Sequence, residues 1–406
     1  PPPPPRFSSR RRHTRYKDWS RGLGDVYKRQ VYFFVVLRHW QPIRQATDFA
    51  AVDLGPGAGP PTHSRENMST QELDTTRLSD YLAAHIPGLS GPITAEKFAG
   101  GQSNPTFKLR SGDSSWVLRR KPPGELLKSA HAVDREYRVI TALQNTDVPV
   151  PRTFVLCEDE SVIGSMFYVM EYLEGRILWD PSLPEAASNE ERSAIFDSMN
   201  ATMAALHNVD VDTVGLSDYG KPGNYFERQT GRWSKQYRAS QTQEIPEMER
   251  LMDYLVANMP EDDGKVSLVH GDYRLDNLMF HPTEPRAIAL LDWELSTLGN
   301  PLADLANQCM AWMLPGGGGI AGMMGVDRKS LGIPTDEEYI ARYCERTGRK
   351  RIDNWNFYII FSMFRLAAIL QGVAKRAELG NASSPEAKAR GELVVPLAEA
   401  AVALID

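Results

Sequence analysis

The sequence predicts an α+β protein with two lobes: a small lobe of five strands and one main helix, followed by a larger, mostly helical lobe. Short strand-like runs separated by turn residues occupy residues 93–172. Beyond residue 175 the apolar residues recur at helical spacing, except in a strand–loop–strand region at residues 268–294. Strands gathered in one part of a chain and helices in another are typical of α+β folds.

The elements of the small lobe follow from its turn residues and from the period of its apolar side chains. Strands are predicted at residues 93–99, 105–109, 115–120, 154–157 and 166–172. A helix is predicted at residues 130–144, because apolar residues from Val133 to Leu143 recur with the helical period. Pro149 and Pro151 prevent this helix from continuing.

The large lobe is predicted to contain long helices on both sides of its strand–loop–strand region. Residues 190–207 and 246–259 have amphipathic spacing before that region. Residues 355–375 form the most apolar stretch of the chain, but Arg365 and Gln371 interrupt it. We therefore expect a buried core helix there and no membrane span.

The composition is ordinary for a globular protein. Of the 406 residues, 42% are hydrophobic and 24% are charged, which excludes a fully disordered chain. The three cysteines, Cys157, Cys309 and Cys344, are far apart and form no C-x-x-C. This disfavours a disulfide scaffold or a structural zinc site and suits a reducing compartment, so we expect a cytoplasmic protein.

Charge separates residues 1–67 from the remainder. They hold 12 Lys and Arg against 5 Asp and Glu, whereas the whole chain has 46 against 52, so the remainder is acidic. An acidic body disfavours binding to a phosphate backbone, and we expect no nucleic-acid partner. The apolar run at residues 31–37 is far shorter than the roughly 20 residues of a membrane span.

Residues 1–67 are expected to be a non-globular basic tail, either disordered or artefactual. The stretch at residues 7–30 resembles translated sequencing-adapter read-through, and we expect the natural protein to begin at Met68. A mitochondrial transit peptide is the alternative, since the segment is basic and contains serine, although Asp18 and Asp25 count against it.

The strongest chemical signal is the run LVHGDYRLDNLMF at residues 268–280, in which an Asn follows the His-Gly-Asp aspartate by five residues. A second apolar run ends in Asp292-Trp293-Glu294. Phosphoryl transfer needs an acceptor hydroxyl held in line and cations that neutralise the phosphates. Asp272 suits a catalytic role, orienting that hydroxyl and accepting its proton, while Asn277 and Asp292 offer the oxygen ligands that magnesium selects.

These motifs, in this order, resemble those of the aminoglycoside phosphotransferase (protein-kinase-like) family. The likeness covers residues 68–406 and is closest to the kinase-like domain fused to some acyl-CoA dehydrogenases and to its free-standing bacterial relatives. It implies a bilobal protein-kinase-like fold, with a nucleotide-binding lobe at residues 68–172 and a catalytic, acceptor-binding lobe at residues 173–406. It also implies ATP and Mg²⁺ as cofactors.

The resemblance implies phosphate-binding residues in the small lobe. The segment that links the first two strands contains Gly100, Gly101, Ser103 and Asn104. Its glycines let backbone N–H groups approach phosphates. The third strand should present the cation that grips the phosphates. We expect this cation to be Arg119, with Lys121 on the same face as the alternative.

Further residues complete the implied nucleotide site. Glu136 lies beside the apolar stripe of its helix and should pair with the strand cation, because an unpaired buried carboxylate is costly. Met170, Glu171 and Tyr172 fall where the hinge of the family lies and would bind an adenine edge through their backbone. Asp304 occupies a position that braces the catalytic loop, and we expect it to cap backbone N–H groups.

The acceptor is a small molecule whose identity stays open. Residues 296–406 hold 12 Lys and Arg and 12 Asp and Glu, without the acidic surplus that suits a polycationic antibiotic. The resemblance instead implies a hydroxyacyl-CoA or related hydroxy acid, and the apolar helix with Arg365 suits an anionic acceptor with an acyl tail. Arg365 pairing internally is the alternative.

Other functions compete with an active alcohol-group phosphotransferase. A nucleotide-binding pseudokinase scaffold and an aminoglycoside-type antibiotic kinase are the alternatives. A hydrolase ranks last, because the chain contains no G-x-S-x-G nucleophile motif. The choice between ATP and GTP and the oligomeric state stay open.

Overall fold

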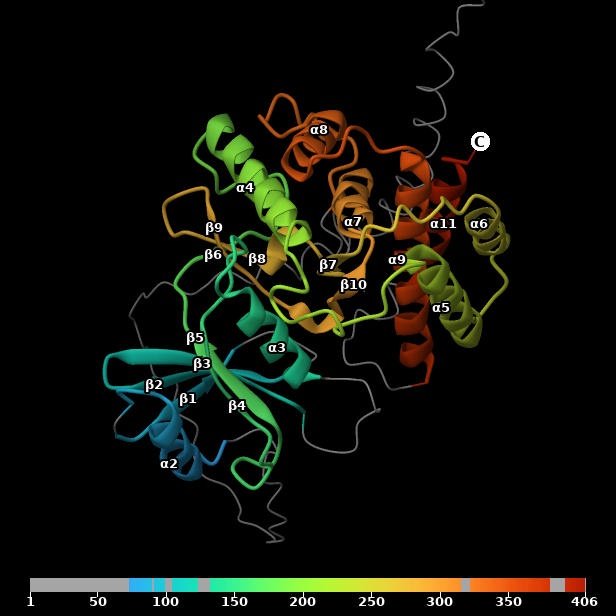
Figure 1. The fold of residues 1–406 in the computed structure, drawn as a ribbon. Coiled ribbons are helices and arrows are strands. Elements are labelled where there is room, and N and C mark those ends of the chain that lie inside the picture. The colour runs from blue at the N-terminus through green and yellow to red at the C-terminus, as the bar shows by residue number, and fades with distance from the viewer. Residues whose placement is uncertain are drawn as a thin grey trace, which may run out of the picture. The chain divides into compact units, whose positions relative to one another are not determined.

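The computed structural model describes residues 73–89, 91–98, 104–122, 132–314, 322–379 and 391–405. All of them belong to one unit that extends from Gln71 to Asp406. Within it, a lobe built on a sheet adjoins a lobe built mainly of helices (Figure 1). The predicted tail at residues 1–67 lies outside the described residues.

The small lobe is a five-stranded sheet with the strand order β1-β2-β3-β5-β4, in which all neighbours are antiparallel. Its strands are β1 (Thr94–Lys97), β2 (Thr106–Ser111), β3 (Ser114–Arg120), β4 (Thr153–Cys157) and β5 (Phe167–Glu171). All five predicted strands are confirmed. The register sets Arg119 of β3 opposite Tyr168 of β5, at the centre of the sheet.

Two helices pack on this sheet, whereas only one was predicted. The predicted helix is α3 (Val133–Leu143), which buries Val139, Ile140 and Leu143. The additional helix, α2 (Thr75–His85), begins at Asp74, whose side chain accepts a hydrogen bond from the Arg77 amide. Helix α2 was not predicted, although Leu78, Tyr81 and Leu82 recur at helical spacing.

The large lobe contains two small sheets. The first pairs β7 (Ser267–Val269) with β10 (Thr297–Gly299), and the second has the order β6-β8-β9. The strands of the second sheet are β6 (Arg176–Ile177), β8 (Leu278–Phe280) and β9 (Ala287–Leu290). The predicted strand–loop–strand region is thereby confirmed, and β8 and β9 bring its two sequence motifs together.

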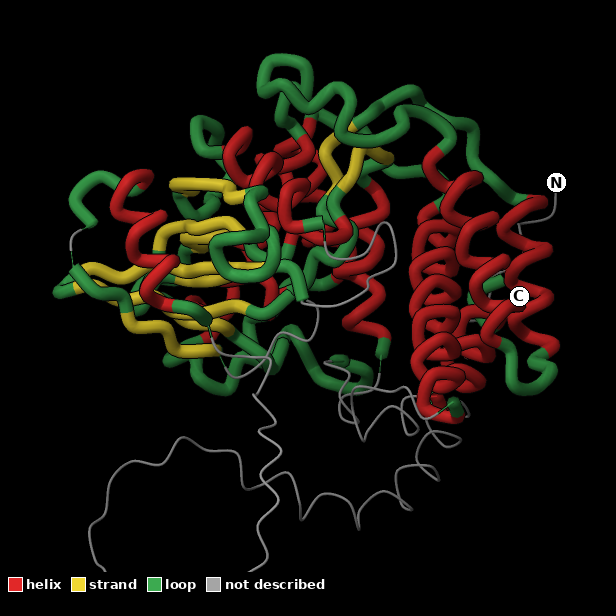
Figure 2. The backbone as a smooth tube through the Cα atoms, turned by 90° about the horizontal axis from the view of Figure 1, so that it is seen from below, coloured by secondary structure: helices red, strands yellow, loops and turns green. Residues whose placement is uncertain are grey.

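Helices make up most of the large lobe. They are α4 (Asn189–His207), α5 (Tyr225–Ser240), α6 (Pro246–Ala257), α7 (Leu302–Met313), α8 (Asp336–Thr347), α9 (Trp355–Glu378) and α11 (Val394–Val402). The helices α5, α6, α9 and α11 gather at the end of the molecule farthest from the five-stranded sheet (Figures 1 and 2).

Helix α9 is the central helix of that group. In the part of the chain that the structure describes, it is the one helix whose length and composition would suffice to cross a membrane. However, 72% of its most apolar window is buried inside the protein. The prediction of a buried core helix at residues 355–375 is confirmed.

We predict that α2 is an integral part of the small lobe. Leu82 is fully buried in a cluster with Phe107 and Trp116. Replacing it with alanine removes apolar contacts and leaves a cavity, so Leu82→Ala should lower the free energy of unfolding by about 2–5 kcal/mol. Denaturant titration of the full chain measures this. Val256→Ala, at a site that is 69% exposed, is the control and should change stability by less than about 0.5 kcal/mol.

Candidate active site

The candidate site is built around residues 270–277, which connect β7 to β8 and are called the catalytic loop below. Gly271 in this loop has φ +83°, and a Cβ there would lie 2.6 Å from the backbone oxygen of Leu295. Only glycine accepts that conformation and that approach without strain. The loop then closes in a single 3-10 turn, Leu275–Asn277, which leads directly into β8.

Two helices of the large lobe hold the catalytic loop by its backbone. Asp304 of α7 accepts the His270 amide at 2.7 Å and the Gly271 amide at 2.8 Å. Arg365 of α9 donates a hydrogen bond to the Gly271 carbonyl oxygen at 2.6 Å. The expected capping role of Asp304 is confirmed, and Arg365 makes the internal contact that was the alternative to binding an acceptor.

Asp304 is a buried carboxylate that stays ionised. Burial acts to raise its pKa, but the hydrogen bond from His207, the nearby histidine rings and the Gly271 amide hold the pKa below its ordinary value. A charge-assisted bond to a backbone amide is stronger than a neutral one. The ionised Asp304 therefore fixes the start of the catalytic loop firmly.

Asp272 and Asn277 are brought together within the catalytic loop. The side-chain amide of Asn277 donates to the Asp272 carbonyl oxygen at 2.8 Å and to its carboxylate at 3.3 Å. This leaves the amide oxygen of Asn277 as an acceptor for a ligand. Arg274 pairs with the other carboxylate oxygen of Asp272 at 3.3 Å and with Asp276 at 3.2 Å.

Asp292 lies next to this loop. The Leu291 amide donates to the Asn277 carbonyl oxygen at 2.8 Å, and the His270 ring bonds the Leu291 carbonyl oxygen at 2.9 Å. Asp292 itself has φ +65° and ψ +62°, a left-handed conformation that is rare outside glycine. Such backbone strain concentrates at functional sites.

The electrostatics also group the acidic residues. Burial raises the pKa of Asp276, Arg274 opposes the shift, and the charges of Asp272 and Asp292 add to it. Asp272 and Asp292 thus both lie close enough to Asp276 for their charges to act on its carboxyl group. A concentration of negative charge of this kind favours a divalent cation.

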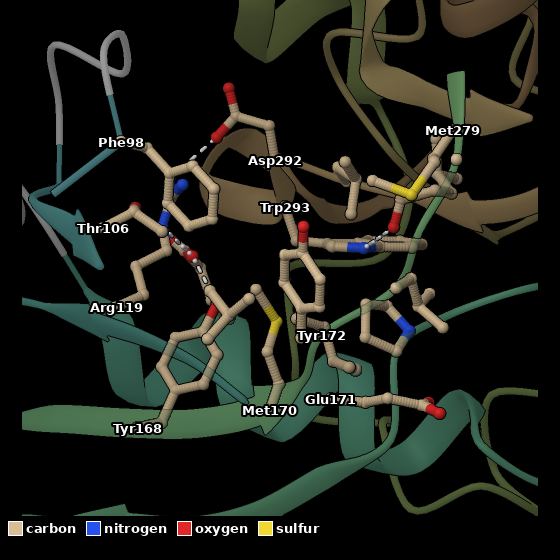
Figure 3. A pocket seen from close by; sticks show the side chains of 18 of the residues that line it. Phe98, Thr106, Arg119, Tyr168, Met170, Glu171, Tyr172, Met279, Asp292 and Trp293 are labelled. Carbon is tan, nitrogen blue, oxygen red and sulfur yellow. Dashed lines mark hydrogen bonds and ion pairs between the residues drawn. The ribbon is translucent and has the colours of Figure 1, made fainter. Parts of the chain in front are cut away.

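Arg119 connects the small lobe to this acidic region. Its guanidinium is 2.8 Å from a Glu136 oxygen and 2.9 Å from an Asp292 oxygen (Figure 3). The predicted partnership of Arg119 with Glu136 is observed, whereas Lys121 lies beyond the end of β3 and not in this ion pair. Burial acts to lower the pKa of Arg119, but Glu136 and the other acidic groups hold it above its ordinary value, so the residue stays charged.

Glu136 is enclosed by donors. It is 1% exposed, and it accepts hydrogen bonds from the side chain of Asn104 at 2.8 Å and from the Tyr168 hydroxyl at 3.1 Å. Burial raises its pKa, and Arg119 opposes that shift. The side chain of Asn104, a residue of the predicted phosphate-binding segment, is thus committed to Glu136. Tyr168 was not predicted as a site residue, although strand alternation places its side chain on the same face of β5 as that of Met170.

A cavity of about 450 Å³ separates the two lobes beside this ion pair. Its predicted site residues are Arg119, Glu136, Met170, Glu171, Tyr172 and Asp292 (Figure 3). Apolar side chains from both lobes, including Val117 and Leu290, complete the walls. Asp272 and Asn277 do not line the cavity, but Asn277 is bonded to Leu291, the residue before Asp292. Gly100, Gly101 and Ser103 fall outside the described residues.

The profile of the phosphotransferase enzyme family, APH, matches residues 94–353. The chain therefore belongs to the aminoglycoside phosphotransferase family, which has a protein-kinase-like fold. The resemblance and the fold class predicted from the sequence are both confirmed.

Among curated proteins, mouse acyl-CoA dehydrogenase family member 10 is 49% identical over 328 residues, which cover 79% of this chain and 30% of that protein. Human acyl-CoA dehydrogenase family member 11 is 42% identical over 356 residues, or 86% of this chain and 45% of that protein. The chain thus spans less than half the length of these relatives.

Solved structures share the architecture. A protein of Ralstonia eutropha, provisionally assigned as an aminoglycoside phosphotransferase, is 51% identical with a TM-score of 0.77, covering 82% of this chain and 98% of its own. A thermostable mutant of aminoglycoside phosphotransferase APH(4)-Ia, in complex with AMP-PNP and hygromycin B, has a TM-score of 0.53 at 15% identity and covers 81% and 98%. This second likeness is one of fold.

We predict that Glu136 is essential to the stability of the small lobe. Glu136→Ala leaves Arg119 buried without its nearest carboxylate, and such a loss typically costs about 3–5 kcal/mol. Chemical denaturation measures the change. Asp134→Ala, at an exposed acidic position on the same helix, should cost at most about 1 kcal/mol. Equal losses in the two variants would contradict the assignment of Glu136 as the buried partner.

Proposed function

We propose that this protein is an ATP- and magnesium-dependent phosphotransferase that moves the terminal phosphoryl group of the nucleotide to an acceptor hydroxyl. The observation that carries the proposal is the ion pair between Arg119 and Asp292 in the wall of a cavity between the lobes, together with the hydrogen bond that ties the catalytic loop to Leu291, the residue before Asp292. Phosphoryl transfer depends mainly on positioning and on charge neutralisation, and these residues are suited to both.

The donor set fits a magnesium ion. In the described ranges, no group of three or more His, Cys, Asp or Glu side chains is arranged to hold a metal by itself. Magnesium commonly binds through one or two protein ligands, together with substrate phosphates and water. The free amide oxygen of Asn277 and the carboxylate of Asp292 would hold it, and the ion when bound would neutralise charge on the outer phosphates.

The remaining roles follow from the contacts. The backbone of residues 170–172 borders the apolar cavity and would bind the adenine edge, while the apolar walls exclude water from the base. The Arg119 guanidinium would bind phosphate oxygens, held in position by Glu136 at 2.8 Å. Asp272, steadied by Asn277 and Arg274, would orient the acceptor hydroxyl and take its proton.

We further propose a hydroxyacyl-CoA or related hydroxy acid as the acceptor. The curated relatives are named as acyl-CoA dehydrogenase family members, and the balanced charge of residues 296–406 does not favour a polycation.

We predict that Asp272→Asn abolishes transfer while nucleotide binding persists. The amide retains the shape of the side chain but cannot accept the proton, so turnover should fall at least about 100-fold. Calorimetry with Mg·ATP and a radiolabelled transfer assay measure the two properties. Asp218→Asn, at an exposed aspartate paired with Arg138, is the control and should retain full activity. Nucleotide binding without transfer to any acceptor by the wild type would instead favour the pseudokinase scaffold.

We predict that an acceptor screen with Mg·ATP identifies hydroxyacyl-CoAs rather than amino-sugars or small alcohols. Transfer should be detected by mass spectrometry as the addition of one phosphate, with Asp272→Asn as the background. Phosphorylation of amino-sugars alone would show that the inference from charge balance is wrong and that the protein is an antibiotic-type kinase.

A further inference from the structure

His207, at the end of α4, is buried among polar partners on both sides of its ring. Its Nε2 lies 3.1 Å from an Asp304 oxygen, and its Nδ1 lies 2.8 Å from the Tyr343 hydroxyl of α8. The side chains of His207 and Asp304 are each 1% exposed. A histidine at the end of a helix commonly caps carbonyl groups, so this arrangement calls for another explanation.

Asp304 is the point where His207 meets the catalytic loop. The same carboxylate oxygen that bonds His207 also accepts the His270 amide, and its other oxygen accepts the Gly271 amide. The three donors together set the rotation of the carboxylate. Because Asp272 follows Gly271 directly, a rotated Asp304 would shift the backbone that carries Asp272.

The tautomer of His207 decides whether its Nε2 can donate a hydrogen bond to Asp304. An ionised carboxylate only accepts hydrogen bonds, so Nε2 must carry the hydrogen. In the tautomer that carries its single hydrogen on Nε2, Nδ1 is an acceptor, and the Tyr343 hydroxyl is the group placed to donate to it. Burial raises the pKa of Tyr343, which keeps its hydroxyl protonated and available as that donor.

We propose that Tyr343 and His207 are positioning residues for phosphoryl transfer. Tyr343 selects the Nε2–H tautomer of His207, His207 orients Asp304, and Asp304 holds the catalytic loop so that Asp272 faces the acceptor. The expected change in turnover rests on the proposed function, whereas the expected change in the hydrogen bonding of the catalytic loop does not. A purely structural role would change the stability of the fold without changing turnover per folded molecule.

Tyr343→Phe is the central test, since it removes the donor and keeps the ring. Hydrogen exchange of the catalytic-loop amides should become faster, because the bonds from His270 and Gly271 to Asp304 weaken. Turnover of Mg·ATP, measured as hydrolysis with water as the acceptor, should fall about three- to tenfold with an unchanged KM for ATP. Tyr339→Phe is the matched control, because Tyr339 is buried on the same helix and its hydroxyl bonds neither His207 nor Asp304 among the described residues. It should leave both measurements unchanged.

Substitution of His207 separates positioning from packing. His207→Gln retains a side-chain N–H for Asp304, so it should keep the slow hydrogen exchange of the loop amides and most of the turnover. His207→Leu lacks that donor and should show faster exchange and reduced turnover. Unchanged loop exchange in Tyr343→Phe, or faster exchange with unaltered turnover, would overturn the proposal. If the wild type turns over no nucleotide, the proposed function and the expected change in turnover fail together, and the exchange measurements alone decide whether this network sets the loop.

Discussion

The ion pair between Arg119 and Asp292 is the interaction on which the candidate site depends. It joins β3 of the small lobe to the chain segment that follows β9, and it places a largely buried cation in the wall of the cavity. Glu136 holds that cation with a second carboxylate, so the position of the guanidinium is fixed by two ion pairs. Preorganised charge of this kind costs no rearrangement at the moment of reaction.

The parts of the site that the sequence reveals are those close together along the chain. Asp272 and Asn277 are five residues apart in one loop, and their meeting follows from that loop alone. The pairing of Arg119 with Glu136 could also be predicted, because a carboxylate next to an apolar stripe requires a cation. The choice of Arg119 over Lys121 depended on where β3 ends, and strand ends are poorly determined by sequence patterns.

Other features could not be predicted, for two different reasons. Helix α5 was not identified because its sequence is largely polar, and the role of its four aromatic residues becomes visible only where they pack, as Phe226 does against Phe361 of α9. The hydrogen bond from Arg365 to Gly271 joins residues 94 positions apart, and the contact of His207 with Tyr343 spans 136. No local periodicity encodes such contacts, since they arise from the way separate helices pack.

The burial of Asp304 has a consequence for how this family can diversify. The loop that carries Asp272 is held by hydrogen bonds to Asp304 of α7, a buried residue. Its geometry therefore depends little on the solvent-facing surface of the large lobe. Substitutions on that surface can therefore change which molecules bind without moving Asp272 and its loop. Members of the family could in this way share one arrangement of interior residues and differ in their acceptors through changes at the surface.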